Sequence, residues 1–189
     1  MDAMVCGIDP GLGVTGYAVL RGGAATAIVD AGVCRGNPKE TLAVRLASLA
    51  EDVAQVLEEH QPAVVAVEQL YSHYQHPRTA ILMGHARGVI LATAARRGID
   101  VRSYSATRIK RFLTGNGRAG KAQVQRAVQT SLSLSRLPEP ADVADAIAIA
   151  LCCITDAKRS PALAESSATW FQQRVYGLAP ASRSARVRA

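Results

Sequence analysis

The first third of the chain alternates short apolar runs with turn sequences. Residues 4–8 and 14–20 are largely apolar and flank the turn sequence DPGLG, and Gly22-Gly23 then precedes a third apolar run at about 25–33. Short apolar runs bounded by glycine, proline and aspartate are typical of strands joined by tight turns. Three antiparallel strands are therefore predicted first.

The middle of the chain changes to a helical period. Between residues 40 and 60, apolar residues recur at alternating spacings of four and three, which predicts an amphipathic helix that ends before Pro62. Residues 63–67 are continuously apolar, as expected for a strand covered by helices on both faces. A helix over about 78–97 and a short strand over 99–103 follow, which completes a parallel strand-helix-strand unit.

The remaining predicted elements are helices. Two of them, over 106–113 and 121–134, are separated by the glycine-rich basic loop TGNGRAG, and the last covers about 142–155. Beyond it serine, alanine, proline and arginine follow one another without any period, which is typical of a flexible segment. We therefore expect one domain over residues 1–157 and a basic, flexible tail over 158–189.

Composition supports a single globular domain. The chain has 189 residues, of which 49% are hydrophobic. No uninterrupted apolar stretch reaches about 18 residues and no basic leader opens the chain, so a soluble, cytoplasmic protein without membrane association is expected. The four cysteines form no CxxC pair, which favours buried thiols in an intracellular protein.

Charge adds a polyanionic partner to this picture. The formal net charge is +7, and seven lysine or arginine residues but no acid occur between Ser105 and Arg136. From Ala157 to the end of the chain, six basic residues accompany one acid, Glu165. Local blocks of this kind favour nucleic acid, although solvated surface charge is the simpler alternative.

Four acids interrupt strongly apolar surroundings. Asp9 ends MVCGID, Glu68 ends AVVAVE, and Asp142 and Asp145 open the apolar run ADVADAIAIALC. Burial of an isolated carboxylate is costly unless a cation compensates it, and no lysine or arginine lies within four residues of Asp9, Asp142 or Asp145. The four acids therefore predict a divalent-metal site, and in a basic chain such a site indicates phosphate chemistry.

Simpler roles exist for some of these acids. Asp9 precedes Pro-Gly, where an aspartate often caps its own turn, and Glu68 can be an ordinary surface residue at a strand end. Asp142 begins a predicted helix, where an acid is a favoured cap and interacts well with the helix dipole. Capping does not explain Asp145, which lies one turn inside the helix and on the same face as Asp142.

Five segments in matching order resemble those of a known family. GIDPGLGVTGYAVL, AVEQLY, GHARGV, KAQVQ and ADVADAIAIA together resemble the RuvC family of crossover-junction endodeoxyribonucleases, over residues 5–151. The resemblance implies the α/β, ribonuclease H-like fold, in which a five-stranded mixed sheet of three antiparallel and then parallel strands is flanked by helices. It also implies an endonuclease of DNA recombination and repair that nicks Holliday junctions symmetrically and leaves 5′-phosphate ends.

The same resemblance assigns roles to individual residues. It makes Asp9, Glu68, Asp142 and Asp145 the catalytic metal ligands, which together could hold two Mg²⁺ ions, with Mn²⁺ as a substitute. Lys121 corresponds to a catalytic basic position near the scissile phosphate, although an ordinary surface lysine is the alternative.

Further residues are expected at the DNA. Tyr71 falls where the family carries an aromatic residue that stacks on unpaired junction bases, and a core tyrosine is the alternative. Arg78 is placed at phosphate from its position beside a polar, histidine-bearing loop. The predicted DNA-binding residues are Tyr71, Arg78, Lys110, Arg111, Arg118 and Lys121.

Small residues along the predicted helix 78–97 suggest close packing of another helix. Gly84, Gly88 and Ala92 form a smooth stripe, and the resemblance places this helix at the contact of a homodimer. A two-fold dimer suits a substrate that needs two matched cuts. The resemblance further implies four-way junction DNA and the branch-migration complex of RuvA and RuvB as partners.

Other functional classes remain open. GIDPGLGVTGYAV also resembles the first phosphate loop of actin-like ATPases and sugar kinases, which usually need a second, similar half and a much longer chain. A different ribonuclease H-like nuclease, acting on RNA or branched DNA, is a second alternative. A non-catalytic DNA-binding module is a third, but it leaves Asp145 unexplained.

Overall fold

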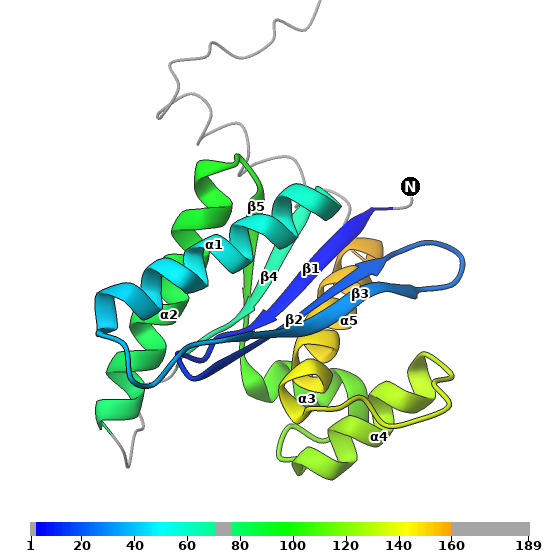
Figure 1. The fold of residues 1–189 in the computed structure, drawn as a ribbon. Helices are drawn as coiled ribbons and strands as arrows, with labels where there is room; N and C mark the ends of the chain where they lie inside the picture. The colour runs from blue at the N-terminus through cyan, green and yellow to red at the C-terminus, as the bar shows by residue number, and fades with distance from the viewer. Residues whose placement is uncertain (1–2, 71–76, 160–189) are drawn as a thin grey trace, which may run out of the picture.

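A single five-stranded mixed sheet organises the computed structural model, which describes residues 3–70 and 77–159 (Figure 1). Its strand order is β3-β2-β1-β4-β5. β1 pairs antiparallel with β2 and β2 with β3, whereas β4 runs parallel to β1 and β5 parallel to β4. The strands are β1 (Met4–Asp9), β2 (Val14–Arg21), β3 (Ala27–Arg35), β4 (Val64–Glu68) and β5 (Asp100–Tyr104). The predicted ribonuclease H-like fold class is confirmed.

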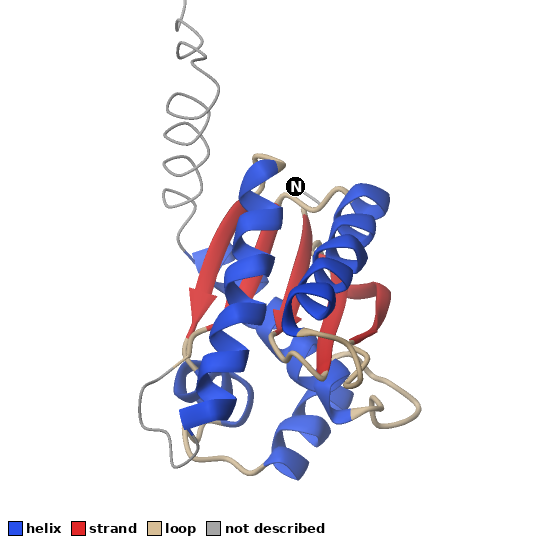
Figure 2. Ribbon diagram, turned by 60° about the vertical axis from the view of Figure 1, so that its left-hand side comes forward, coloured by secondary structure: helices blue, strands red, loops and turns tan. Residues whose placement is uncertain are grey.

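Helices cover both faces of this sheet (Figure 2). The apolar side chains of α1 and α2 pack on one face around Ile8 and Val67, and those of α3, α4 and α5 pack on the other around Val5 and Ala66. The helices are α1 (Leu42–His60), α2 (Pro77–Arg96), α3 (Ala106–Thr114), α4 (Lys121–Ser131) and α5 (Ala141–Arg159). The sheet is therefore buried on both sides, as the continuous apolar run of β4 predicted.

Element boundaries differ from the predicted ones by a few residues, and local chemistry explains the largest shifts. α1 begins at Leu42 because the Thr41 side chain accepts a hydrogen bond from the backbone N–H of Val44 and caps the helix. α4 stops at Ser131 rather than at residue 134, because the chain turns through Ser133, whose φ is +51°. α5 continues beyond the predicted residue 155 to Arg159.

The centre of the molecule is the contact between α5 and β1. A Cβ atom added to Gly7 would overlap the backbone of α5, at 2.7 Å from the amide nitrogen of Ala150. Glycine at this position therefore lets the helix lie directly on the strand.

All four cysteines are buried free thiols, as expected from their spacing. In the described part of the chain, no helix combines the length and apolarity that a membrane crossing requires.

Candidate active site

The four acids singled out in the sequence line one cavity of about 380 Å³. Asp9 and Glu68 are the last residues of β1 and β4, and Asp142 and Asp145 lie in the first two turns of α5. The cavity thus opens at the carboxyl ends of two parallel strands, a usual place for a site in an α/β sheet. Lys110 and Lys121 also line it, as do the apolar side chains of Val14, Met83, Ile109, Val124 and Ile149.

Strand register brings the first two acids together. β1 and β4 are neighbours, and their last paired residues are Ile8 and Val67. Asp9 and Glu68 each follow that pair by one position, so their side chains project toward the same face of the sheet, and neighbouring strands lie about 4.8 Å apart. The pairing of β1 with β4 was not readable from local sequence alone.

A glycine in β2 brings α5 to these strand ends. Gly16 pairs with Asp9 in the β1–β2 ladder. A Cβ atom at Gly16 would overlap the backbone carbonyl group of Asp142 and would lie 3.0 Å from the Cβ atom of Asp142. Asp142 therefore sits directly over the partner residue of Asp9. Local sequence does not predict this role of Gly16, because only the tertiary contact with α5 reveals it.

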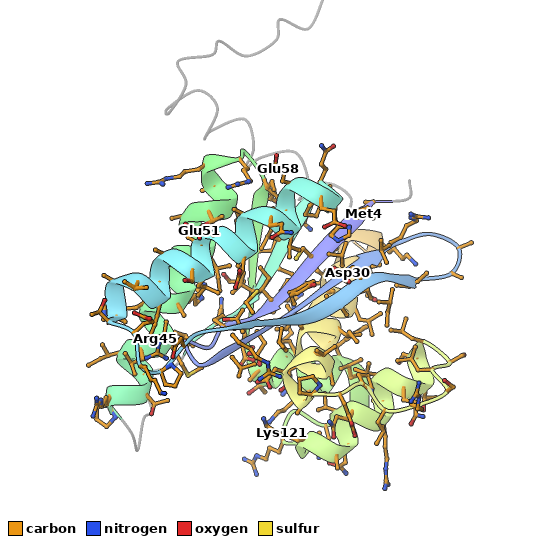
Figure 3. All side chains as sticks on the ribbon, in the orientation of Figure 1. Met4, Asp30, Arg45, Glu51, Glu58 and Lys121 are labelled. Carbon is orange, nitrogen blue, oxygen red and sulfur yellow. The ribbon has the colours of Figure 1, made fainter. Side chains whose placement is uncertain are left out.

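The turn after Asp9 is fixed from several sides. The fully buried Thr15 hydroxyl donates to the carbonyl of Gly11 at 2.5 Å and accepts from the Gly11 amide at 3.2 Å. Arg45 of α1, labelled in Figure 3, donates to the carbonyl of Leu12 at 3.1 Å. Thr15 and Arg45 thus hold the backbone of this turn, and the Asp9 carboxylate lines the cavity.

Burial and mutual repulsion change the protonation of the acids. Burial, then the neighbouring Glu68, Asp145 and Asp142, raise the pKa of Asp9 to about 7, while Lys121 opposes the shift. The pKa of Glu68 is also raised, first by burial and then by Asp145. The pKa of Asp145 is raised by burial, against the lowering effect of Lys121. The cavity therefore favours a bound cation, which would stabilise all of these carboxylates in their charged form.

Two lysines supply positive charge at the same place. Lys121 begins α4 at the edge of the cavity (Figure 3), and its Nζ lies 3.8 Å from Oδ2 of Asp145. The lysine side chain is 75% exposed, so this ion pair is weak and the lysine is free to turn to another anion. Lys110 of α3 acts on the same acids, because its charge lowers the pKa values of Glu68 and Asp145.

The donor set fits a hard divalent cation. Carboxylate oxygens are the ligands that Mg²⁺ and Mn²⁺ prefer, and here four carboxylates share one cavity. Residues 3–70 and 77–159 nevertheless contain no three acid, histidine or cysteine side chains that are drawn together tightly enough to enclose an ion.

The remaining predicted DNA contacts occupy different surroundings. Arg111 and Arg118 are exposed on α3 and on the loop before α4, beside the cavity, and Arg78 is exposed in the first turn of α2. Arg108 is held differently: it donates to Oδ2 of Asp156 at 2.6 Å and lies over the ring of Tyr104. Tyr71 lies outside the described residues, so its role stays a prediction.

The predicted dimer stripe lies on the outer side of α2. Gly84, Gly88 and Ala92 are exposed, and a Cβ atom added to either glycine would meet nothing within 4 Å. Arg87, the neighbour of Gly88 in the chain, instead reaches the end of β4, where its Nε donates to the carbonyl of Glu68 at 3.0 Å. Sequence analysis gave no function to Arg87, which lies inside the GHARGV motif.

Comparison with known proteins gives a consistent picture. Residues 5–153 match the family model described as crossover junction endodeoxyribonuclease RuvC. A protein of that name from Rhodopirellula baltica is 52% identical over 149 residues, which are 78% of this chain and 84% of the relative. Another, from Pelotomaculum thermopropionicum, is 39% identical over 150 residues, which are 79% of this chain and 91% of the relative.

Solved structures agree with the sequence matches. The structure of Thermus thermophilus RuvC in complex with a Holliday junction substrate superposes with a TM-score of 0.78 at 32% identity, over 84% of this chain and 96% of the other. The yeast mitochondrial Holliday junction resolvase Ydc2 shares the fold, with a TM-score of 0.58 at 14% identity over 87% of this chain and 86% of the other. The chain belongs to the RuvC family of crossover junction endodeoxyribonucleases.

Proposed function

We propose that this protein resolves four-way DNA junctions by hydrolysing one phosphodiester bond in each of two strands of like polarity. The observation that carries this proposal is the cavity in which Asp9, Glu68, Asp142 and Asp145 meet Lys110 and Lys121. The family match and the similarity to a RuvC structure that contains a Holliday junction support the substrate. The chain is accordingly a structure-selective endonuclease acting in DNA recombination and repair.

The acids act by holding cations and water at the scissile phosphate. Nucleases of this family are metal-dependent, and we assign Asp9, Glu68, Asp142 and Asp145 as the ligands of two Mg²⁺ ions, for which Mn²⁺ can substitute. When bound, such ions supply an activated water and stabilise charge on the departing oxygen. Asp9 and Glu68 each end a strand of the central sheet, so their backbones need little rearrangement when the site binds cations.

The lysines act on the phosphate itself. Lys121 is exposed and is only weakly paired with Asp145, so its ammonium group can turn to a non-bridging phosphate oxygen as negative charge develops there. Lys110 also lines the cavity and adds positive charge from α3. Arg111 and Arg118 extend the basic surface away from the cavity and bind neighbouring phosphates, and Arg78 binds them from α2.

Two active sites are needed for two matched cuts. The exposed stripe of Gly84, Gly88 and Ala92 on α2 supports a homodimer in which two copies meet through this helix. Such a dimer presents two cavities to a substrate that itself has two-fold symmetry. Contact with a branch-migration complex of RuvA and RuvB and a cytoplasmic location stay predictions.

The decisive experiment uses a synthetic mobile four-way junction. The protein is incubated with the labelled junction and Mg²⁺ or Mn²⁺, and the nicks are mapped on all four strands. We expect paired nicks at symmetric positions with 5′-phosphate ends. Because a ligase joins a 5′-phosphate to a 3′-hydroxyl, ligation of the products without end repair tests whether the nicks have these ends.

Substitutions of the four acids test which of them are needed for cutting. Asp9→Asn, Glu68→Gln, Asp142→Asn and Asp145→Asn should each bind the junction and fail to cut it. A variant that keeps wild-type turnover would remove that residue from the ligand set. Tight ATP binding without any nicking would instead support the actin-like alternative, and equal cutting of plain duplex or RNA would contradict junction selectivity.

A further inference from the structure

One guanidinium group joins the carboxyl ends of the two parallel strands beside the active site. Arg87 of α2 donates from Nε to the backbone carbonyl of Glu68 at 3.0 Å and from Nη2 to Oγ of Ser103 at 2.7 Å. Glu68 is the last residue of β4, and Ser103 is the last but one of β5. Both hydrogen bonds have good lengths, and the guanidinium is partly buried.

Glu68 needs this support because strand pairing holds it on one side only. The ladder between β1 and β4 ends at Ile8 and Val67, whereas Glu68 still pairs with Tyr104 of β5. The next amide, of Gln69, donates to the carbonyl of Tyr104 at 2.8 Å. The Glu68 carbonyl therefore lies where the sheet stops on its β1 side, and Arg87 holds the peptide whose rotation would swing the carboxylate away from Asp9.

The arrangement of α2 separates Arg87 from the reacting groups. Met83, one helical turn before Arg87, lines the cavity, but Arg87 itself does not. Gly84 and Gly88 belong to the exposed side of the helix. Arg87 thus reaches the backbone behind the site rather than the space in which a phosphate would lie, and it can affect the chemistry only through Glu68.

We propose that Arg87 is a positioning residue for Glu68, with Ser103 as the second anchor of its guanidinium group. An arginine suits this task because its planar group donates to two acceptors in a fixed relative geometry, which a lysine ammonium does not. Residues that orient a metal ligand from behind typically contribute about 10- to 100-fold in metal affinity or activity. The inference rests on the proposed nuclease function.

The test compares Arg87→Gln and Arg87→Lys with a matched control, Arg97→Gln. Arg97 directly follows the C-terminal end of α2 and donates to the carbonyl of Thr93 at 3.3 Å. Its replacement therefore removes the same charge without removing a hydrogen bond to Glu68. Four quantities are measured: the melting temperature, the junction affinity without metal, the calorimetric affinity for Mn²⁺ without DNA, and the single-turnover cutting rate.

We expect Arg87→Gln to lower both the Mn²⁺ affinity and the cutting rate by about 10- to 100-fold and to leave junction affinity unchanged. Arg87→Lys should recover part of both losses, and Arg97→Gln should behave as wild type. If Arg87→Gln does not fold, Ser103→Ala carries the test, with smaller losses in the same two quantities. A variant that loses thermal stability but retains wild-type Mn²⁺ affinity and cutting rate would overturn the proposal.

Glu68→Gln separates this inference from the proposed function. If the wild-type protein does not cut junctions with any divalent metal, the proposed function fails. If wild type cuts, Glu68→Gln does not, and Arg87→Gln cuts at the wild-type rate, only the role of Arg87 is refuted.

Discussion

At the scale of single residues, the most unusual group is Asp9, a partly buried carboxyl group in the neighbourhood of three other acids. Its ordinary pKa of 3.8 rises to about 7, first through burial and then through Glu68, Asp145 and Asp142. Between these two pH values the unfolded chain ionises Asp9 while the folded, metal-free protein keeps it protonated. The folded state then binds more protons than the unfolded state, so its stability must fall as pH rises through this range.

The fall of stability with rising pH can be measured. The melting temperature of the metal-free protein should fall as pH rises from about 4 to about 7, and Asp9→Asn should reduce that fall. Each pKa unit corresponds to about 1.4 kcal/mol, so Asp9 accounts for at most a few kcal/mol. Addition of Mg²⁺ at neutral pH should recover the loss in wild type and much less in Asp9→Asn. A melting temperature that is independent of pH in this range would contradict the raised pKa.

The four acids that meet in the cavity could be singled out from the sequence, but not every residue that contributes to the geometry of the site could. Asp9, Glu68, Asp142 and Asp145 were visible because charge is costly in an apolar segment and because they fall in recognisable motifs. Gly16 and Arg87 were not. Their contributions consist of contacts with residues far away in the chain, and no local pattern encodes such contacts.

At the scale of elements, the site depends on how closely α5 can lie against β1 and β2. The first turn of α5 rests on Gly16, and its middle rests on Gly7. The apolar run of α5 and the apolar strands predicted that these elements would be buried, but not which of them would touch. The order of strands in the sheet likewise follows from long-range packing, so periodicity alone did not predict it.

Gly16→Ala tests this dependence. The added methyl group would overlap the backbone of Asp142, so α5 must shift, and overpacking of this kind costs about 1 to 3 kcal/mol of folding free energy. We expect a lower melting temperature together with a marked loss of cutting. Gly13→Ala is the matched control, because a Cβ atom there meets nothing within 4 Å. Equal activity of Gly16→Ala and wild type would show that Asp142 need not lie where the structure places it.

At the scale of the whole molecule, the basic residues of α3 and α4 and the acids of α1 lie on opposite faces of the sheet. α3, α4 and the loop between them carry the basic block that has no acid between Ser105 and Arg136. On the other side of the sheet, the exposed surface of α1 carries acids, including Glu51 and Glu58 (Figure 3). The basic residues around the mouth of the cavity therefore favour the approach of a DNA backbone there.

The salt dependence of junction binding measures how many phosphate contacts this basic surface makes. A substitution that removes one phosphate contact should lower the slope of log affinity against log salt by about 0.9. Arg111→Gln and Arg118→Gln should each produce a change of this size. Arg108→Gln is the control and should change the slope less, because Asp156 already compensates the charge of Arg108. Identical slopes for all three variants would argue against a DNA path over α3 and the loop before α4.

The exposed small-residue stripe on α2 leads to a prediction about homodimer formation. If two copies meet through the small-residue stripe, Gly88→Arg should prevent close approach of the helices and yield a monomer in sedimentation measurements. Its melting temperature should change little apart from the effect of dissociation, since the position is exposed. The monomer should still nick junctions but should no longer pair its nicks. A protein that stays dimeric despite Gly88→Arg would place the contact elsewhere.

The glycine contact between α5 and the sheet also determines the stage of synthesis and folding at which the four acids can come together. Asp9 is made near the start of synthesis, whereas Asp142 and Asp145 leave the ribosome only near the end of the described domain. α5 must then dock on β1 and β2 before four acids share one cavity. A nascent or truncated chain that lacks this helix has the strands and the basic surface but lacks Asp142 and Asp145. We expect nuclease activity to appear only after α5 has docked on the sheet, because Asp142 and Asp145 lie in this helix.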